Sequence, residues 1–191
     1  MHPLTRFLHS MTLHVSIAPL AVARVLFGAA ITFSCIRFMA LGWVHDQYVA
    51  PKWHFPYAGF EWVTSLGDPG MYVLFGVMTL AAMGVMLGAW YRVSIIVFAL
   101  TFTYVELIDK TYYLNHYYFV SLTAFLFALL PAHRRFSVDV WRRPFQTLDT
   151  IPRWCIDILK FQLGIVYGYA GVAKMTSSWL IDAMPLRLWM P

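Results

Sequence analysis

Residues 71–91 carry no charged side chain and are mostly apolar. A helix needs roughly 20 such residues to cross about 30 Å of hydrocarbon. Backbone groups in lipid must form hydrogen bonds within their own segment, so an apolar run of this length is a helix rather than a strand. The segment therefore predicts a membrane-spanning helix, and it constrains the whole chain to a membrane fold.

The composition of the whole chain agrees with this prediction. Of its 191 residues, 60% are hydrophobic and 12% are charged, whereas soluble domains carry about 25% charged residues. The mean hydropathy is +0.63. We expect an all-α, polytopic membrane bundle of about five transmembrane helices, which form one domain over residues 1–191. The expected helices cover residues 17–42, 70–90, 93–109, 113–131 and 154–175.

The connections between these helices are of two kinds. Residues 43–69 are rich in aromatic residues and proline. Disordered linkers lack aromatic residues, so we expect this aromatic loop to fold against the bundle at the membrane interface. Residues 132–153 contain five arginines, which indicates a basic interfacial segment that faces lipid head groups.

Positive charge predicts the orientation, because Lys and Arg concentrate on the cytoplasmic side. With a cytoplasmic N-terminus, seven basic residues lie inside and four outside. We therefore expect an integral membrane protein of the bacterial inner membrane, or of the endoplasmic reticulum in a eukaryote, with an extracytoplasmic aromatic loop. The net charge of +5 is then a topology signal and does not indicate nucleic-acid binding. The inner set is Arg6, Arg92, Arg134, Arg135, Arg142, Arg143 and Arg153, and the outer set is Lys52, Lys110, Lys174 and Arg187.

Ionisable residues gather at the outer end of the third expected helix. Glu106, Asp109 and Lys110 stand at helical spacing, which places them on one face. Ionisable groups in membrane segments are costly and are functional candidates by default. Carboxylates and a lysine also suit a helix that simply ends in water, so the spacing alone leaves both interpretations open.

Arginines and histidines are the other polar candidates. Charged residues that lie toward the same membrane surface on different helices can form ion pairs. This predicts ion pairs of Arg24 with Asp157, and of Arg37 with Glu106 or Asp109. Three histidines share the outer side with acidic residues, but no pair has the compact spacing of a metal-ligand motif. We expect these histidines to form hydrogen bonds, and we expect no metal. They are His45, His54 and His116.

Three stretches of the chain, together with the Arg24–Phe27–Gly28 group, resemble successive signatures of one family. This is the horizontally transferred transmembrane (HTTM) domain family, which includes vitamin K-dependent gamma-carboxylase. The resemblance covers residues 17–191. Family proteins continue further, so we expect this chain to correspond to the N-terminal part of a longer family domain. The stretches are "KWHFPYAGFEWV" (52–63), "LIDKTYYLNHYYFVSL" (107–122) and "QLGIVYGYAGVAKMTSSWL" (162–180).

The resemblance implies an enzyme of the carbon-carbon lyase class that carboxylates peptidyl glutamate and couples this to quinol epoxidation. It implies vitamin K hydroquinone, or a similar menaquinone-like quinol, with O2 and CO2 or bicarbonate. Lys110 would deprotonate the quinol, which favours a dry pocket because only an unprotonated amine is a base. His54 would assist proton transfer or orient the quinol. The residues expected to support Lys110 and the quinol oxygens are Asp109, Tyr113, Asn115 and His116.

Two other functions compete with the enzyme. One is a non-enzymatic helical membrane module for binding or assembly with the same fold. The other is a small transporter, although transporters place polar groups near the midplane and this cluster lies at one end. For the enzyme, the expected partners are the lipid bilayer, a Glu-containing peptide or protein, and a C-terminal portion of the longer domain.

Overall fold

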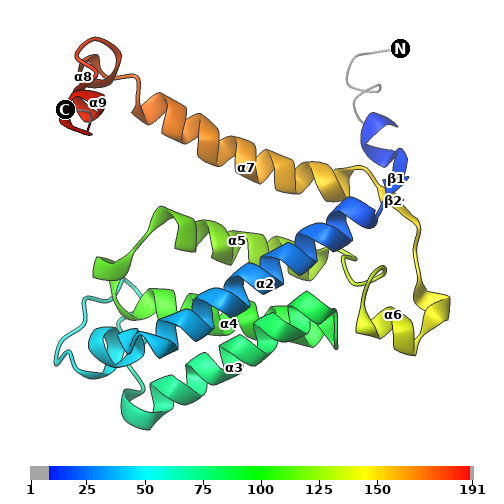
Figure 1. Ribbon diagram of the computed structural model, residues 1–191, viewed down its shortest axis with the longest axis horizontal. Helices are drawn as coiled ribbons and strands as arrows, with labels where there is room; N and C mark the ends of the chain where they lie inside the picture. The colour runs from blue at the N-terminus through cyan, green and yellow to red at the C-terminus, as the bar shows by residue number, and fades with distance from the viewer. Residues whose placement is uncertain (1–8, 190–191) are drawn as a thin grey trace. The chain divides into compact units, whose positions relative to one another are not determined.

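The computed structural model describes residues 9–189, which divide into two compact units, Met1–Arg153 and Trp154–Pro191 (Figure 1). Four long helices form the first unit, and α2 packs on α3, α3 on α4, and α4 on α5. The inner-side candidate Arg6 lies outside the described residues. The four helices are α2 (Ala18–Ala40), α3 (Gly67–Leu87), α4 (Tyr91–Ile108) and α5 (Asn115–Leu129).

The second unit begins with the long helix α7 (Trp154–Ala173). Two short helices follow it, α8 (Ser177–Leu180) and α9 (Met184–Trp189). The expected all-α helical bundle is thus confirmed, with a helix at each of the five expected places. Four of them, α2, α3, α4 and α7, are long and apolar enough to cross a membrane. Helix α5 has 15 residues, fewer than the roughly 20 that a straight crossing needs.

Apolar side chains cover the outside of the bundle. In the most apolar stretches of α2 and α3, only 39% of the residues are buried within the protein. Large hydrophobic residues such as Phe33, Leu80 and Val93 are more than half exposed. A membrane supplies the missing apolar surroundings, because lipid chains cover such faces as well as a protein core does.

Short elements complete the connections between the long helices. At one end of the bundle, η1 (His45–Val49) is a π-helix in the aromatic loop, and η2 (Lys110–Tyr112) is a 3-10 turn between α4 and α5. At the other end, α6 (Val138–Arg142) and η3 (Pro144–Gln146) belong to the basic segment. Successive helices alternate in direction, so the aromatic loop and the basic segment lie at opposite ends of the bundle (Figure 1).

A two-stranded antiparallel sheet was not expected from the sequence. Strand β1 (His14–Ser16) pairs with β2 (Thr150–Pro152), with Val15 opposite the buried Ile151. The pairing joins the segment before α2 to the end of the basic segment. Three residues are too few to show a strand periodicity, which is why the sequence did not reveal it.

Glycines allow the close approach of the helices. A Cβ atom at Gly28 of α2 would lie 2.5 Å from the backbone nitrogen of Met86 in α3. Gly88 ends α3 with φ +64, and a Cβ there would collide with the guanidinium of Arg24. Only glycine combines this left-handed backbone with the space that Arg24 needs.

Arg24 is fully buried, and its Nη2 donates to the carbonyl oxygen of Phe136 at 2.5 Å. The guanidinium also interacts electrostatically with Asp139. Arg24 therefore joins α2 to the basic segment of its own unit. Asp157, the partner that depth predicted for Arg24, lies in the second unit, where it forms an ion pair with Lys160 at 3.7 Å.

The contact at Gly28 can be tested by substitution. Gly28→Val should force α2 and α3 apart and lower the free energy of unfolding by about 1–3 kcal/mol, since added volume in a packed core creates strain. Thermal unfolding in detergent measures the change. Gly76→Ala is the control, because a Cβ at Gly76 would meet no atom within 4 Å. An equal loss of stability in both variants would contradict the contact.

The orientation can be tested by cysteine labelling. We expect a cysteine at position 142 to react with a membrane-impermeant maleimide only from the cytoplasmic side, and a cysteine at position 52 only from the opposite side. The native residues Arg142 and Lys52 are both exposed, and the native thiols of Cys35 and Cys155 are buried. Labelling of position 142 from outside would reverse the orientation.

Candidate functional site

The aromatic loop folds onto the bundle, as its composition predicted. The backbone N–H of Lys110 donates to the carbonyl oxygen of Phe55 at 2.9 Å. The Tyr104 hydroxyl donates to the carbonyl oxygen of Thr64 at 2.8 Å. These bonds hold the loop against the C-terminal end of α4 and bring His54 over the turn that follows.

Asp109 organises this turn. Helix α4 ends at Ile108, and Asp109 adopts an extended backbone. Its Oδ1 atom accepts hydrogen bonds from the backbone N–H of Thr111 at 2.9 Å and from the Thr111 hydroxyl at 2.7 Å. Asp109 thus caps η2 in the way that aspartate caps the start of a helix.

Glu106, Asp109 and Lys110 do not share one helical face, so that prediction was wrong. It assumed that the helix continues through residue 110, whereas the cap at Asp109 turns the chain. The result is that Asp109 is 5% exposed while the side chain of Lys110 is exposed.

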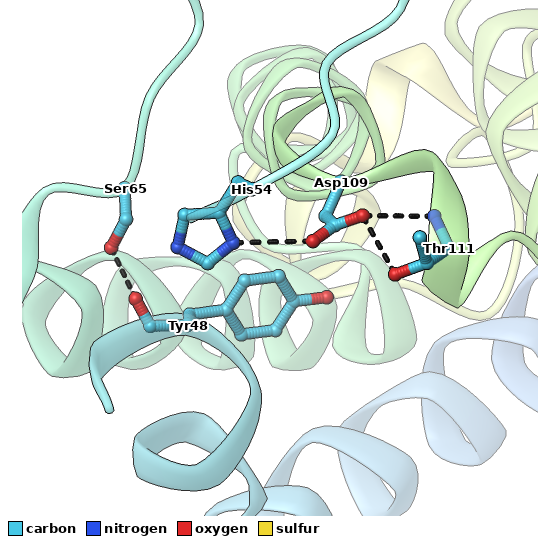
Figure 2. A network of polar contacts seen from close by, with 5 residues as sticks. All are labelled: Tyr48, His54, Ser65, Asp109 and Thr111. Carbon is cyan, nitrogen blue, oxygen red and sulfur yellow. Dashed lines mark hydrogen bonds and ion pairs between the residues drawn. The ribbon is translucent and has the colours of Figure 1, made fainter. Parts of the chain in front are cut away.

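His54 joins the same network from the aromatic loop (Figure 2). Its Nδ1 atom lies 3.3 Å from Oδ2 of Asp109. Desolvation by itself would raise the pKa of Asp109, but hydrogen bonds from Thr111, His54 and Phe55 outweigh it and hold the pKa below its usual value. The ionised carboxylate only accepts hydrogen bonds, so the proton of neutral His54 belongs on Nδ1. Its Nε2 atom can then accept a proton from another group.

Two cavities lie at this end of the bundle. His54 lines the first, which has a volume of about 480 Å³ and also contains Lys52 and Glu61. The second, of about 230 Å³, is walled mainly by apolar and aromatic side chains with few polar groups. Arg37, Glu106 and His116 supply polar atoms in the second cavity, which is the composition of a site for a largely apolar ligand.

Glu106 also lines a third cavity of about 340 Å³, together with Tyr113. One carboxyl group therefore contributes to two apolar cavities. The sequence predicted an ion pair of Arg37 with Glu106 or Asp109, and the structure places the side chains of Arg37 and Glu106 in the same cavity wall, while the ion pair itself stays a prediction. The guanidinium of Arg37 lies 5.1 Å from the ring centroid of Trp43.

The structure separates the six predicted site residues into three groups. His54 and Asp109 are hydrogen-bonded to each other. His116 and Tyr113 line different apolar cavities. Lys110 and Asn115 have exposed side chains, so Lys110 does not lie in the dry pocket that its proposed role favours. Lys110 and Asn115 are exposed where the chain turns between α4 and α5.

Two residues of the candidate site were not predicted from the sequence. Thr111 holds Asp109 with two hydrogen bonds, and the Asp-x-Thr spacing of a capping turn was a signal that could have revealed it. Tyr48 comes from the π-helix, lines the 230 Å³ cavity and accepts a hydrogen bond from Ser65 through its backbone carbonyl. No sequence pattern indicates such a π-helix.

No group of three or more His, Cys, Asp or Glu side chains within residues 9–189 is arranged to hold a metal ion. The link between His54 and Asp109 is a hydrogen bond. What this pair can do chemically is hold an imidazole in one tautomer and orientation, with one nitrogen available as a base.

The model of the HTTM domain family matches residues 14–191, which is nearly the whole chain. No solved structure gives a significant match.

The Asp109 network predicts a defined loss of stability. Asp109→Ala should lower the free energy of unfolding by about 1–3 kcal/mol, because the partly buried donors of Thr111 and His54 lose their acceptor. The folded-state pKa of Asp109 is lowered, so its contribution is complete above the ordinary carboxyl pKa of about 3.9 and is lost as the pH falls below it. Denaturant unfolding at several pH values should show the variant and the parent converging in acid.

Asp46→Ala is a matched control for this measurement. Asp46 is an exposed aspartate of the same aromatic loop, and exposed substitutions usually change stability by less than about 0.5 kcal/mol. A difference between parent and Asp109→Ala that widened as the pH fell would contradict the lowered pKa.

Proposed function

Because this chain belongs to the HTTM domain family, we propose that it is a vitamin K-dependent gamma-carboxylase-like membrane enzyme. It carboxylates peptidyl glutamate with a reduced quinone, O2 and CO2. The observation that carries this proposal is the hydrogen-bonded His54–Asp109 pair at the same end of the bundle as an apolar cavity lined by Glu106 and His116. An oriented base and an apolar cavity at one end of the bundle suit proton abstraction from a membrane-soluble quinol.

The apolar cavity suits a ring-sized head group. Its volume of about 230 Å³ is below the roughly 300–1,000 Å³ of sites that enclose a whole drug-sized ligand, so a ring fits while a long isoprenoid tail remains in lipid. Arg37, Glu106 and His116 provide polar atoms for the ring oxygens. When bound, the reduced quinone supplies, with O2, the strong base that takes a γ-proton from glutamate and allows CO2 to add.

The residues of this chain bind and orient the quinol and move protons. In this proposal the amine of Lys110 takes a proton from a quinol hydroxyl, and its exposure gives that proton a route to water. Asp109 holds His54 so that Nε2 assists as a second base. His116, which lines the 230 Å³ cavity, supports an oxygen atom of the quinol through a hydrogen bond, and the roles of Tyr113 and Asn115 stay predictions from the family resemblance.

The proposal includes a location and partners. The site faces the extracytoplasmic side, where a Glu-containing peptide or protein arrives, and the quinol enters from the bilayer. These features follow from the charge distribution and from the family resemblance.

A specific observation favours the second candidate, a non-enzymatic binding or assembly module. The side chain of Lys110 is exposed, and an exposed amine is a weaker base candidate than one in a dry site. In such a module, Lys110 only adds charge at a helix end. The enzyme requires the unprotonated amine of Lys110, whereas the binding module requires only its positive charge.

The deciding experiment supplies reduced vitamin K, labelled bicarbonate and a Glu-containing peptide to the protein in detergent or lipid, in whatever longer form is active. Quinol-dependent label in the peptide supports the enzyme. Lys110→Ala should abolish this label while folding is retained, and a small exogenous amine should restore part of it. The restored rate should rise with the unprotonated fraction of that amine.

Lys110→Arg separates charge from basicity. A guanidinium stays protonated at any workable pH, so the arginine variant should remain inactive if the amine is the base. Lys160→Ala, which removes a lysine of α7 paired with Asp157, is the control and should keep full activity. Near-normal activity of Lys110→Arg would exclude Lys110 as the base, and absence of label in a well-folded parent would favour the binding module.

A further inference from the structure

A basic pocket of about 250 Å³ lies at the end of the bundle opposite the candidate site. Three arginines line it, Arg92 from α4 and Arg142 and Arg143 from the basic segment. The proposed function does not use this pocket. Its residues come from segments about 50 positions apart in the sequence, so the fold assembles it.

Asp139 fixes the two walls of the pocket to each other. Its carboxylate accepts the backbone N–H groups of Trp90 at 2.8 Å and Tyr91 at 2.9 Å, which caps the start of α4. Its own backbone N–H donates to the carbonyl oxygen of Gly88 at 3.0 Å. The basic segment is thereby attached to the turn between α3 and α4.

The arginines keep donors that can face a ligand. Each guanidinium carries five N–H groups in a planar fork. Arg92 donates one of them to the carbonyl oxygen of Ala128. The guanidinium of Arg142 lies over the ring of Trp90, 5.2 Å from its centroid. Its N–H groups therefore remain available at the edge of the guanidinium plane. Both oxygens of Asp139 accept backbone N–H groups, and within the described residues this carboxylate forms no ion pair with Arg92, Arg142 or Arg143.

His133 is a second, independent indication of a ligand. It is 9% exposed and lines the pocket, and its Nδ1 atom has no hydrogen-bond partner within residues 9–189. Its ring stacks on Tyr91 with centroids 5.0 Å apart. Burial first, then the charges of Arg92 and Arg134, lower the pKa of His133 to about 4. The neutral ring therefore offers a hydrogen bond without adding charge.

The surroundings of the pocket are those of a membrane interface. Trp90, Trp141 and Phe145 are between 72% and 83% exposed, although they are large aromatic residues. Exposed Trp beside Arg is typical of the head-group layer, where rings contact acyl chains and cations contact phosphates. A forked arginine pair matches the oxygens of a phosphate.

We propose that this pocket is a phosphate-binding site that holds the head group of an anionic phospholipid. The arginines bind the phosphate oxygens, His133 adds a hydrogen bond, and the exposed aromatic residues contact the acyl chains. A bound lipid would bridge α4 and the basic segment, and would therefore stabilise the bundle whether or not the proposed carboxylase activity exists.

The test compares lipids and variants on the whole chain in a neutral detergent. Phosphatidylglycerol should raise the unfolding temperature and remain bound in native mass spectrometry, whereas phosphatidylcholine should not. The double variant Arg142→Lys and Arg143→Lys keeps the charge but loses the forks, so it should bind phosphatidylglycerol about tenfold more weakly, as expected for lost hydrogen bonds to a charged group. Arg92→Lys is the second variant if the double variant does not fold.

Arg135→Gln is the matched control. Arg135 belongs to the same basic segment but forms an ion pair with Asp149, so its loss should change lipid affinity less than about twofold despite the lost charge. Equal weakening in the control, or unchanged affinity in the lysine variants, would show general charge attraction and overturn the site. Protection by inorganic phosphate at the same concentration as the lipid would assign the pocket to free phosphate and overturn the lipid.

Discussion

The structure depends on two aspartates that stand at the two ends of helix α4. Asp139 accepts the first backbone N–H groups of the helix, and Asp109 follows its last residue and caps the next turn. Free backbone groups at helix ends are costly in or near lipid. Each carboxylate satisfies such groups and also attaches a distant segment to the helix. At one end this is the basic segment, and at the other it is the aromatic loop through His54.

Arg24 extends this principle into the bundle. A fully buried guanidinium in a membrane helix needs partners. That of Arg24 donates a hydrogen bond to the carbonyl oxygen of Phe136 and interacts electrostatically with Asp139. The position is possible only because Gly88 leaves room for it. One buried charge thus determines how α2, the end of α3 and the basic segment fit together.

The sequence predicted the helices and missed the capping. Hydrophobic runs set by the thickness of the bilayer are long, so the ends of α2, α3, α4 and α7 were predicted to within three residues. Three-residue elements such as β1, β2 and η2 depend on side-chain hydrogen bonds between distant segments, which have no periodic signal. This is why the shared face of Glu106, Asp109 and Lys110 was wrong, whereas the loop over the turn was right.

The candidate site was predicted only in part, for the same reason. His54 and Asp109 were both proposed from the family resemblance, but their hydrogen bond could not be derived, because 55 positions separate them. The 230 Å³ cavity combines residues of α2, α3, α4, α5 and the aromatic loop. No spacing rule relates residues of five segments, so only the folded chain shows that Arg37, Glu106 and His116 face one space.

The length of α4 determines what the two polar ends can do together. Its 18 residues rise about 27 Å at 1.5 Å per residue, close to the roughly 30 Å of bilayer hydrocarbon. Asp109 and Asp139 therefore lie near opposite membrane surfaces. The polar groups of the candidate site gather at one surface instead of the midplane, which disfavours a transporter. The proposed chemistry at one surface and the proposed lipid binding at the other would use the same helix as a rigid spacer, so that neither end has to bury charge in hydrocarbon.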